Sequence, residues 1–220
     1  MGGFFKSSIG RKVAMALSAF FLMLFLLQHF AINMLSVFNA DAFNAVSHYM
    51  GTNWLIQFII QPILIFAVVF HFVMGFVLEL KNKSARNLSY VNNNGSANST
   101  WMSRNMIYSG MVILAFIVLH FIDFWIPELK YKYVEVLPED PNRYFEELIH
   151  KFENPLRVVA YIIAFVLLSL HLLHGFTAAF QSIGVSTIRK KLLQKIGRAY
   201  AIIIPLGFIF IALFHYFTHH

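Results

Sequence analysis

Five long apolar segments, separated by short polar stretches, dominate the pattern of hydrophobic and polar positions along the chain. Each holds the roughly 20 mostly apolar residues that a helix needs to cross the hydrocarbon core of a bilayer. We therefore expect an all-α integral membrane bundle of five transmembrane helices, with residues 1–220 forming one domain. The expected helices cover Val13–Phe38, Trp54–Leu80, Asn105–Ile126, Pro155–Gln181 and Ile196–Phe217.

Local signals at the segment ends agree with this division. Asn154 followed by Pro155 is typical of a helix start, with an N-cap and a first-turn proline. The Asn-, Ser- and Gly-rich stretch Asn92–Thr100 indicates a surface loop. Pro62 and Pro205 lie inside apolar segments, where each is expected to kink its helix.

The composition supports a membrane protein and excludes several kinds of site. Hydrophobic residues make up 59% of the chain and charged residues 12%, whereas soluble domains average about 25% charged residues. The chain has no Cys, which excludes disulfides, thiolate iron–sulfur ligation and cysteine zinc sites. We expect the surrounding medium to be membrane lipid and expect no nucleic-acid partner, because the basic residues form no soluble patch interleaved with aromatic residues.

The distribution of Lys and Arg predicts the orientation of the bundle. The amino terminus, the second loop and the fourth loop share one side of the membrane, whereas the acidic third loop lies on the other. Most of the 17 basic residues lie on the first side, which places the amino terminus in the cytoplasm and the carboxyl terminus outside. Those residues are Lys6, Arg11, Lys12, Lys81, Lys83, Arg86, Arg104, Arg189, Lys190, Lys191, Lys195 and Arg198.

Four histidines, one on each of the first four segments, form the main candidate site. Each lies at a similar distance beyond the polar boundary where its segment begins, which corresponds to about 25 Å along a helix. Because successive helices run in opposite directions, His29 and His120 are expected on the outer side of the bundle. His71 and His171 are expected on the inner side.

Two such pairs point to two b-type haems enclosed by the bundle. Two histidines on opposite sides of a haem iron leave no open coordination position, which favours electron transfer over oxygen chemistry. We predict that the four histidines are iron ligands, with His29 and His120 on an outer haem and His71 and His171 on an inner one. Gly75 and Gly175 follow the inner pair by four residues and leave room for a macrocycle.

Other interpretations of these histidines remain open from spacing alone. A histidine in a spanning helix can be a hydrogen-bonded structural residue or part of a proton relay. His174 lies one turn beyond His171 on the same face, and is an alternative ligand or a pocket residue. His48 is expected in the outer loop, His150 in solvent, and His215 in a structural role near the outer end of the fifth helix.

Several short motifs in the chain are similar to those of a known family. They are Ser8–Lys12, Leu27-Gln28-His29 with Asn33, Asp41–Asn44, Ser47–Met50, Phe70–Gly75, Leu119-His120, Leu170–Gly175 and Gln181–Gly184. In this order, over nearly the whole chain, they resemble the cytochrome b558 subunit of succinate dehydrogenases and fumarate reductases.

The resemblance implies the single-chain, di-haem membrane anchor of succinate:quinone oxidoreductase, respiratory complex II, in a bacterial cytoplasmic membrane. It implies the same two histidine pairs, with His171 as the fourth ligand. Its partners would be a flavoprotein subunit and an iron–sulfur subunit, which carry the succinate chemistry, so this chain has no catalytic residue for succinate. Electrons would pass from the inner haem to the outer haem and then to a quinone, expected to be menaquinone.

Polar side chains near each expected haem provide further candidates, each of which could equally be an ordinary cap or flanking residue. Candidates for hydrogen bonds to a quinone near the outer haem are Gln28, Asn33, Asn44, His48 and Asp123. Candidates near the inner haem propionates are Ser7, Ser8, Arg11, Arg104, Lys190 and Lys191. The alternative functions are a di-haem quinone cytochrome of another respiratory oxidoreductase, such as a nitrate reductase or formate dehydrogenase, and a proton-coupled transporter.

Overall fold

The computed structural model describes residues 7–84, 106–185 and 187–219, and within those ranges it is helical and contains no strand. Five helical segments there are long and apolar enough to cross a membrane, which indicates a multi-pass membrane protein. They are Ser8–Phe38, Ile56–Asn82, Met106–Val134, Pro155–Ser182 and Lys191–Thr218. The predictions of an all-α protein and of five helices long and apolar enough to span a membrane are confirmed for the described residues.

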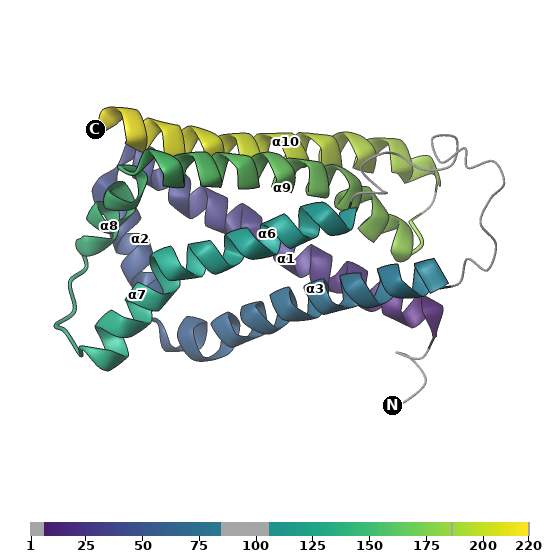
Figure 1. The fold of residues 1–220 in the computed structure, drawn as a ribbon, viewed down its shortest axis with the longest axis horizontal. Helices are drawn as coiled ribbons and strands as arrows, with labels where there is room; N and C mark the ends of the chain where they lie inside the picture. Colours follow the sequence, from purple (N-terminus) through teal and green to yellow (C-terminus); the bar gives the residue numbers. More distant parts are fainter. Residues whose placement is uncertain (1–6, 85–105, 186, 220) are drawn as a thin grey trace.

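The long helices lie side by side in an elongated bundle (Figure 1). They are α1 (Ser8–Phe38), α3 (Gln61–Ser84), α6 (Met106–His120), α9 (Pro155–Ser182) and α10 (Thr187–Thr218). The end where α1 and α10 begin and α3 and α9 end carries basic residues such as Lys12, Lys81, Lys191 and Lys195, and is called the basic end.

Three short helices cover the opposite end, called the capped end. They are α2 (Ala40–Thr52), α7 (Ile126–Leu129) and α8 (Arg143–Phe152). The expectation that His48 lies in a loop is wrong, because α2 occupies that connection. Asn39 starts α2 by accepting a hydrogen bond from the Ala42 amide at 2.9 Å, and α8 forms because Leu148 and Phe152 are buried on one face.

The third spanning segment extends beyond its predicted end at Ile126. A π-helical turn η2 (Phe121–Trp125), helix α7 and a second π-helical turn η3 (Lys130–Val134) continue α6 without a break. Pro127 lies in α7 directly after the π-helical turn η2, so the proline coincides with a change in the helical hydrogen-bond pattern. In the same way, α10 begins before the predicted Ile196, so Lys191 and Lys195 lie on a helix rather than in a loop.

The sequence predicted a helix start at Pro155 and kinks at Pro62 and Pro205, and the structure differs among the three sites. The predicted helix start at Asn154 is confirmed, since its side chain accepts hydrogen bonds from the backbone amides of Leu156 and Arg157 at 3.0 and 3.3 Å. Pro62 is the second residue of α3, which begins at Gln61 directly after a π-helical turn, η1 (Ile56–Ile60). Helix α10 runs unbroken through Pro205.

A buried apolar cluster joins α2, α8, α9 and α10, and side chains of α1 pack against it. Phe43, Leu148, Phe165, Phe208 and Ile211 belong to this cluster. Glycine at position 207 of α10 makes room for Phe30 of α1, because a Cβ at Gly207 would lie 2.2 Å from Cε2 of Phe30. In contrast, α6 has no buried residue, and Ala67 is the one buried hydrophobic residue in the described part of α3.

Candidate functional site

The ring of His29 on α1 faces the ring of His120, the last residue of α6. The ring centres are 5.7 Å apart and the planes are nearly perpendicular, at 86°. Aromatic side chains surround this pair: Phe25 stacks on His29 at 5.4 Å, and Phe124 lies 5.2 Å from His120. Both histidines lie in the half of the bundle nearer the capped end.

His71 on α3 and His171 on α9 form a second pair nearer the basic end. Their ring centres are 6.4 Å apart, with the planes at 66°. Spacing and charge therefore led to the same two pairs that are neighbours in the structure. All four imidazoles are only partly buried, although each contacts a histidine on another helix. The packing of the helices thus leaves part of each of these histidine residues accessible.

Two serines fix the orientation of the second pair. The Ser18 hydroxyl lies 3.1 Å from Nδ1 of His71 and donates its proton to the Met15 carbonyl at 2.8 Å. The Ser109 hydroxyl lies 3.2 Å from Nδ1 of His171 and donates to the Met106 carbonyl at 2.9 Å. A hydroxyl has one proton, so each oxygen can only accept from Nδ1–H. The proton is therefore on Nδ1, and Nε2 of each ring keeps its lone pair for a ligand.

His120 has a different partner, Tyr161 on α9. The Tyr161 hydroxyl lies 3.5 Å from Nδ1 of His120 and donates to Oδ2 of Asp123 at 2.8 Å. Oδ1 of Asp123 accepts from Nη1 of Arg157 at 2.5 Å. The sequence did not reveal Ser18, Ser109 and Tyr161 as neighbours of the histidines, or Arg157 as the partner of Asp123. The serines had one visible signal, since each is a small polar residue in a largely apolar stretch.

The five quinone candidates do not converge on one point. Asn44 is buried, and its side-chain oxygen accepts a hydrogen bond from the Phe145 amide at 2.8 Å, which stabilises the start of α8. Asp123 is 2% exposed and uses both oxygens on protein donors. Gln28 and Asn33 flank His29 on α1. Gln28 is exposed, and Asn33 donates to the His29 carbonyl at 2.8 Å.

Among the remaining histidines, His48, His150 and His215 have partners elsewhere, whereas His174 lies beside His171 on α9. His48 lies on α2, 3.9 Å from Glu139, and His150 is exposed beside Glu153 at 3.1 Å. His215 is 1% exposed, and its Nε2 lies 2.8 Å from the Ser36 hydroxyl. His174 is partly buried on α9, one turn beyond the ring that contacts His71.

The propionate candidates lie at the basic end, with mixed roles. Ser7 caps α1 by accepting a hydrogen bond from the Gly10 amide at 2.9 Å. Ser8 and Lys191 are exposed, and Arg11 is partly buried. Arg104 and the side chain of Lys190 lie outside the described residues.

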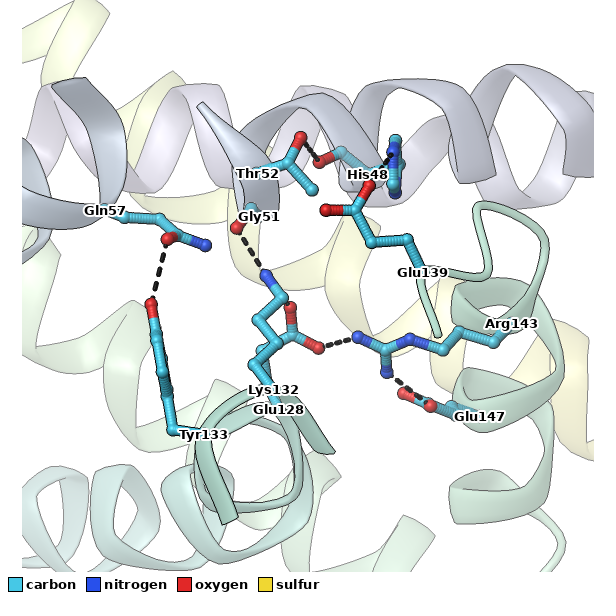
Figure 2. Close-up of polar contacts among 10 residues, drawn as sticks. All are labelled: His48, Gly51, Thr52, Gln57, Glu128, Lys132, Tyr133, Glu139, Arg143 and Glu147. Carbon is cyan, nitrogen blue, oxygen red and sulfur yellow. Dashed lines mark hydrogen bonds and ion pairs between the residues drawn. The ribbon is translucent and has the colours of Figure 1, made fainter. Parts of the chain in front are cut away.

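A charged cluster closes the capped end (Figure 2). This capping cluster consists of Glu128, Lys132, Arg143 and Glu147. Lys132 contacts Glu128 and the Gly51 carbonyl of α2, and Arg143 bonds to Glu128 and, at 2.6 Å, to Glu147. These contacts tie α2, α7 and α8 together.

Burial and charge shift the pKa values of two residues at the capped end. Burial lowers the pKa of Arg143, but its hydrogen bonds to Glu128 and Glu147 reverse the effect and raise its pKa above the ordinary value. Burial, aided by the charge of Glu128, raises the pKa of Tyr144 to about 12. Arg143 therefore stays charged and Tyr144 stays neutral at physiological pH.

The donor set at each histidine pair suits a metal that receives its other ligands from a cofactor. No group of three or more His, Asp or Glu side chains able to hold a metal ion occurs in the part of the chain that the structure describes. Two imidazoles that bind one metal from opposite sides, each at about 2 Å, have ring centres roughly 6 Å apart. The observed separations of 5.7 and 6.4 Å lie on either side of this value.

Comparisons with protein-family models, with curated proteins and with solved structures found no match to this chain.

Proposed function

We propose that this chain is a di-haem membrane cytochrome b, the anchor subunit of a succinate:quinone oxidoreductase. His29 and His120 hold an outer haem, and His71 and His171 hold an inner haem. The observation that carries the proposal is the pair of histidine–histidine contacts at two levels of the bundle, with separations of 5.7 and 6.4 Å. A bare metal ion would need more protein ligands than two, whereas a porphyrin supplies four nitrogens itself.

The surroundings of the pairs support a flat apolar cofactor. Phe208 lies 5.8 Å from His29, and Phe116 lies 5.9 Å from His120. A Cβ at Gly75 would meet only Cε of Met15, at 3.7 Å, and one at Gly110 would meet Cε1 of His171 at 3.8 Å. Because these are ordinary van der Waals contacts, packing within the protein does not require glycine at either position. A cofactor edge beside the inner pair would explain both glycines.

The chain's own residues hold, orient and shield the two centres. When bound, the two haems supply one-electron carriers between the basic end and the capped end. Ser18 and Ser109 keep Nδ1 of the inner histidines protonated, so that Nε2 is the nitrogen presented to a metal. Two imidazoles would hold each haem iron, His29 with His120 and His71 with His171, and the centre would then carry electrons rather than bind oxygen. The apolar walls lower the local dielectric and keep bulk water away.

The succinate chemistry belongs to partner subunits in this proposal. The chain has no Cys to ligate an iron–sulfur cluster, so a flavoprotein subunit and an iron–sulfur subunit supply the electrons. They dock at the basic end, which faces the cytoplasm, where Lys12, Lys81 and Lys191 offer complementary charge. A quinone, with menaquinone as the first choice, is reduced near the outer pair, where Gln28 and Asn33 lie beside His29.

Purification of the chain from its native membrane in a mild detergent tests this assignment. We expect two larger subunits to co-purify, one with a covalent or tightly bound flavin and one with iron–sulfur clusters, and succinate to reduce the haem of the complex. Co-purification with the subunits of a different oxidoreductase, and haem that succinate does not reduce, would overturn the succinate assignment. A colourless complex would favour the proton-coupled transporter.

A further inference from the structure

Asp123 is a carboxylate inside a membrane-spanning segment, three residues after His120, with 2% of its surface exposed. Burial of an unpaired charge there would be strongly unfavourable. Both oxygens have protein donors: Arg157 at 2.5 Å and Tyr161 at 2.8 Å. Both contacts come from donors, so the two carboxylate oxygens of Asp123 act as hydrogen-bond acceptors beside the positive charge of Arg157.

Tyr161 connects this carboxylate to His120. Its hydroxyl gives its single proton to Asp123, so the phenol oxygen can only accept from Nδ1–H of His120, at 3.5 Å. Tyr161 is 2% exposed, and its ring packs edge-on against Phe116 at 4.9 Å and Phe152 at 5.4 Å. These ring contacts fix the orientation of the Tyr161 side chain, so its hydroxyl points to Asp123.

The backbone at this point is also unusual. The π-helical turn Phe121–Trp125 begins directly after His120 and contains Asp123. Wide turns of this kind inside α-helices occur frequently at functional sites. The only buried residue of the turn is Asp123. The turn therefore directs a charged side chain inward just beyond the histidine.

The inner pair has a different arrangement. His71 and His171 each donate Nδ1–H to a serine hydroxyl that is itself bonded to a backbone carbonyl, so their partners are neutral. His120 donates to a hydroxyl that is bonded to a carboxylate. Of these three imidazoles, only His120 has a partner backed by a charge.

We propose that Tyr161 and Asp123 are positioning residues for His120, in which Tyr161 transmits the negative charge of Asp123 to Nδ1 and strengthens Nε2 as a ligand. This inference rests on the proposed function, because it treats His120 as a haem ligand. A hydrogen bond to an anionic acceptor makes an imidazole a better electron donor and stabilises the higher oxidation state of its metal. Asp123 therefore lowers the midpoint potential of the outer haem, and Arg157 offsets part of this effect.

Optical redox titration of the purified complex tests the proposal. Tyr161→Phe and Asp123→Asn should each raise the midpoint potential of one haem and leave the other unchanged. Arg157→Gln, which leaves the carboxylate without its counter-charge, should lower the potential of that same haem. Tyr200→Phe is the matched control, because it removes a tyrosine hydrogen bond to the Met23 carbonyl at 2.6 Å, away from the histidines, and should shift neither potential.

The outcomes separate this inference from the proposed function. Two haems with unchanged potentials in both Tyr161→Phe and Asp123→Asn, or equal shifts of both haems, overturn the positioning role and leave the di-haem assignment intact. An unaltered protein without haem overturns the di-haem assignment and the inference with it. If Tyr161→Phe does not fold, Asp123→Asn carries the same test, because it preserves the shape of the side chain.

Discussion

The hydroxyl of Ser18 on α1 lies 3.1 Å from Nδ1 of His71 on α3, and an equivalent contact joins Ser109 on α6 to His171 on α9 at 3.2 Å. Each histidine of the inner pair is thus oriented by a serine on a different helix. Residues that orient a metal-binding histidine are commonly worth 10- to 100-fold in metal affinity, so these contacts lead directly to a prediction.

Ser18→Ala and Ser109→Ala should each weaken retention of the inner haem by about 10-fold, at the lower end of that range. The outer haem should stay in place. Haem loss to an excess of apomyoglobin, followed by absorbance, measures the effect. Ser36→Ala is the matched control: it removes a buried serine–histidine contact, at 2.8 Å to His215, outside both pairs. Equal haem loss in the control and in the two test variants would contradict the orienting role.

Substitution of the histidines should remove the haems separately. His120→Ala should abolish the outer haem and spare the inner one, and His71→Ala should do the reverse, because each pair lies at its own level of the bundle. Pyridine haemochrome content with redox titration identifies the haem that remains. Loss of only the inner haem in His120→Ala would refute the pairing.

The choice between His171 and His174 can be tested in the same way. The ring that contacts His71 is that of His171, so His171→Ala should lose the inner haem. His174→Ala should retain both haems, with at most a shifted absorbance maximum. Retention of the inner haem in His171→Ala, together with its loss in His174→Ala, would make His174 the ligand.

The capping cluster should contribute to the stability of the capped end. Arg143 is 9% exposed and Glu128 is 20% exposed, between the usual environments of surface and buried ion pairs. Arg143→Gln should therefore cost on the order of 2 kcal/mol. Lys130→Gln, which breaks the solvent-exposed pair with Glu135, should have no measurable effect. Thermal unfolding in detergent compares the two, and equal midpoints would show that the cluster does not stabilise the cap.

The orientation of the chain in the membrane can be measured by thiol labelling. The chain itself gives no background signal, because it has no cysteine. Single substitutions Ser8→Cys at the basic end and Glu139→Cys at the capped end place a thiol on each side. A membrane-impermeant maleimide should label Glu139→Cys in intact cells and label Ser8→Cys only after permeabilisation. The opposite pattern would invert the topology and move the partner subunits to the other side.

The spanning helices and the identity of the histidine pairs could be predicted from the sequence. Three features are visible in the sequence alone: the length of each apolar segment, the alternating direction of successive helices and the asymmetric distribution of Lys and Arg. Together they place His29 and His120 at the same depth in the membrane. The start of α9 was predictable because Asn154-Pro155 is a purely local signal.

Other features depend on contacts that sequence position does not reveal. Helix α2 was missed because its polar residues resemble a loop until Phe43 packs into the bundle and Asn39 caps it. The helical continuation past Pro127 depends on π-helical turns, which leave no clear pattern in the sequence. The neighbours of the histidines, such as Ser18 and Tyr161, lie on other helices. They become visible only once rotation and register are known.

The haem content of the purified chain tests the central claim most directly. A reduced-minus-oxidised spectrum combined with a pyridine haemochrome assay and a protein assay gives the number and type of haems per chain. The two histidine pairs predict two b-type haems, both low-spin in the oxidised state because both axial positions are filled. A preparation with no b-type absorbance, or with one haem per folded chain, would contradict the assignment.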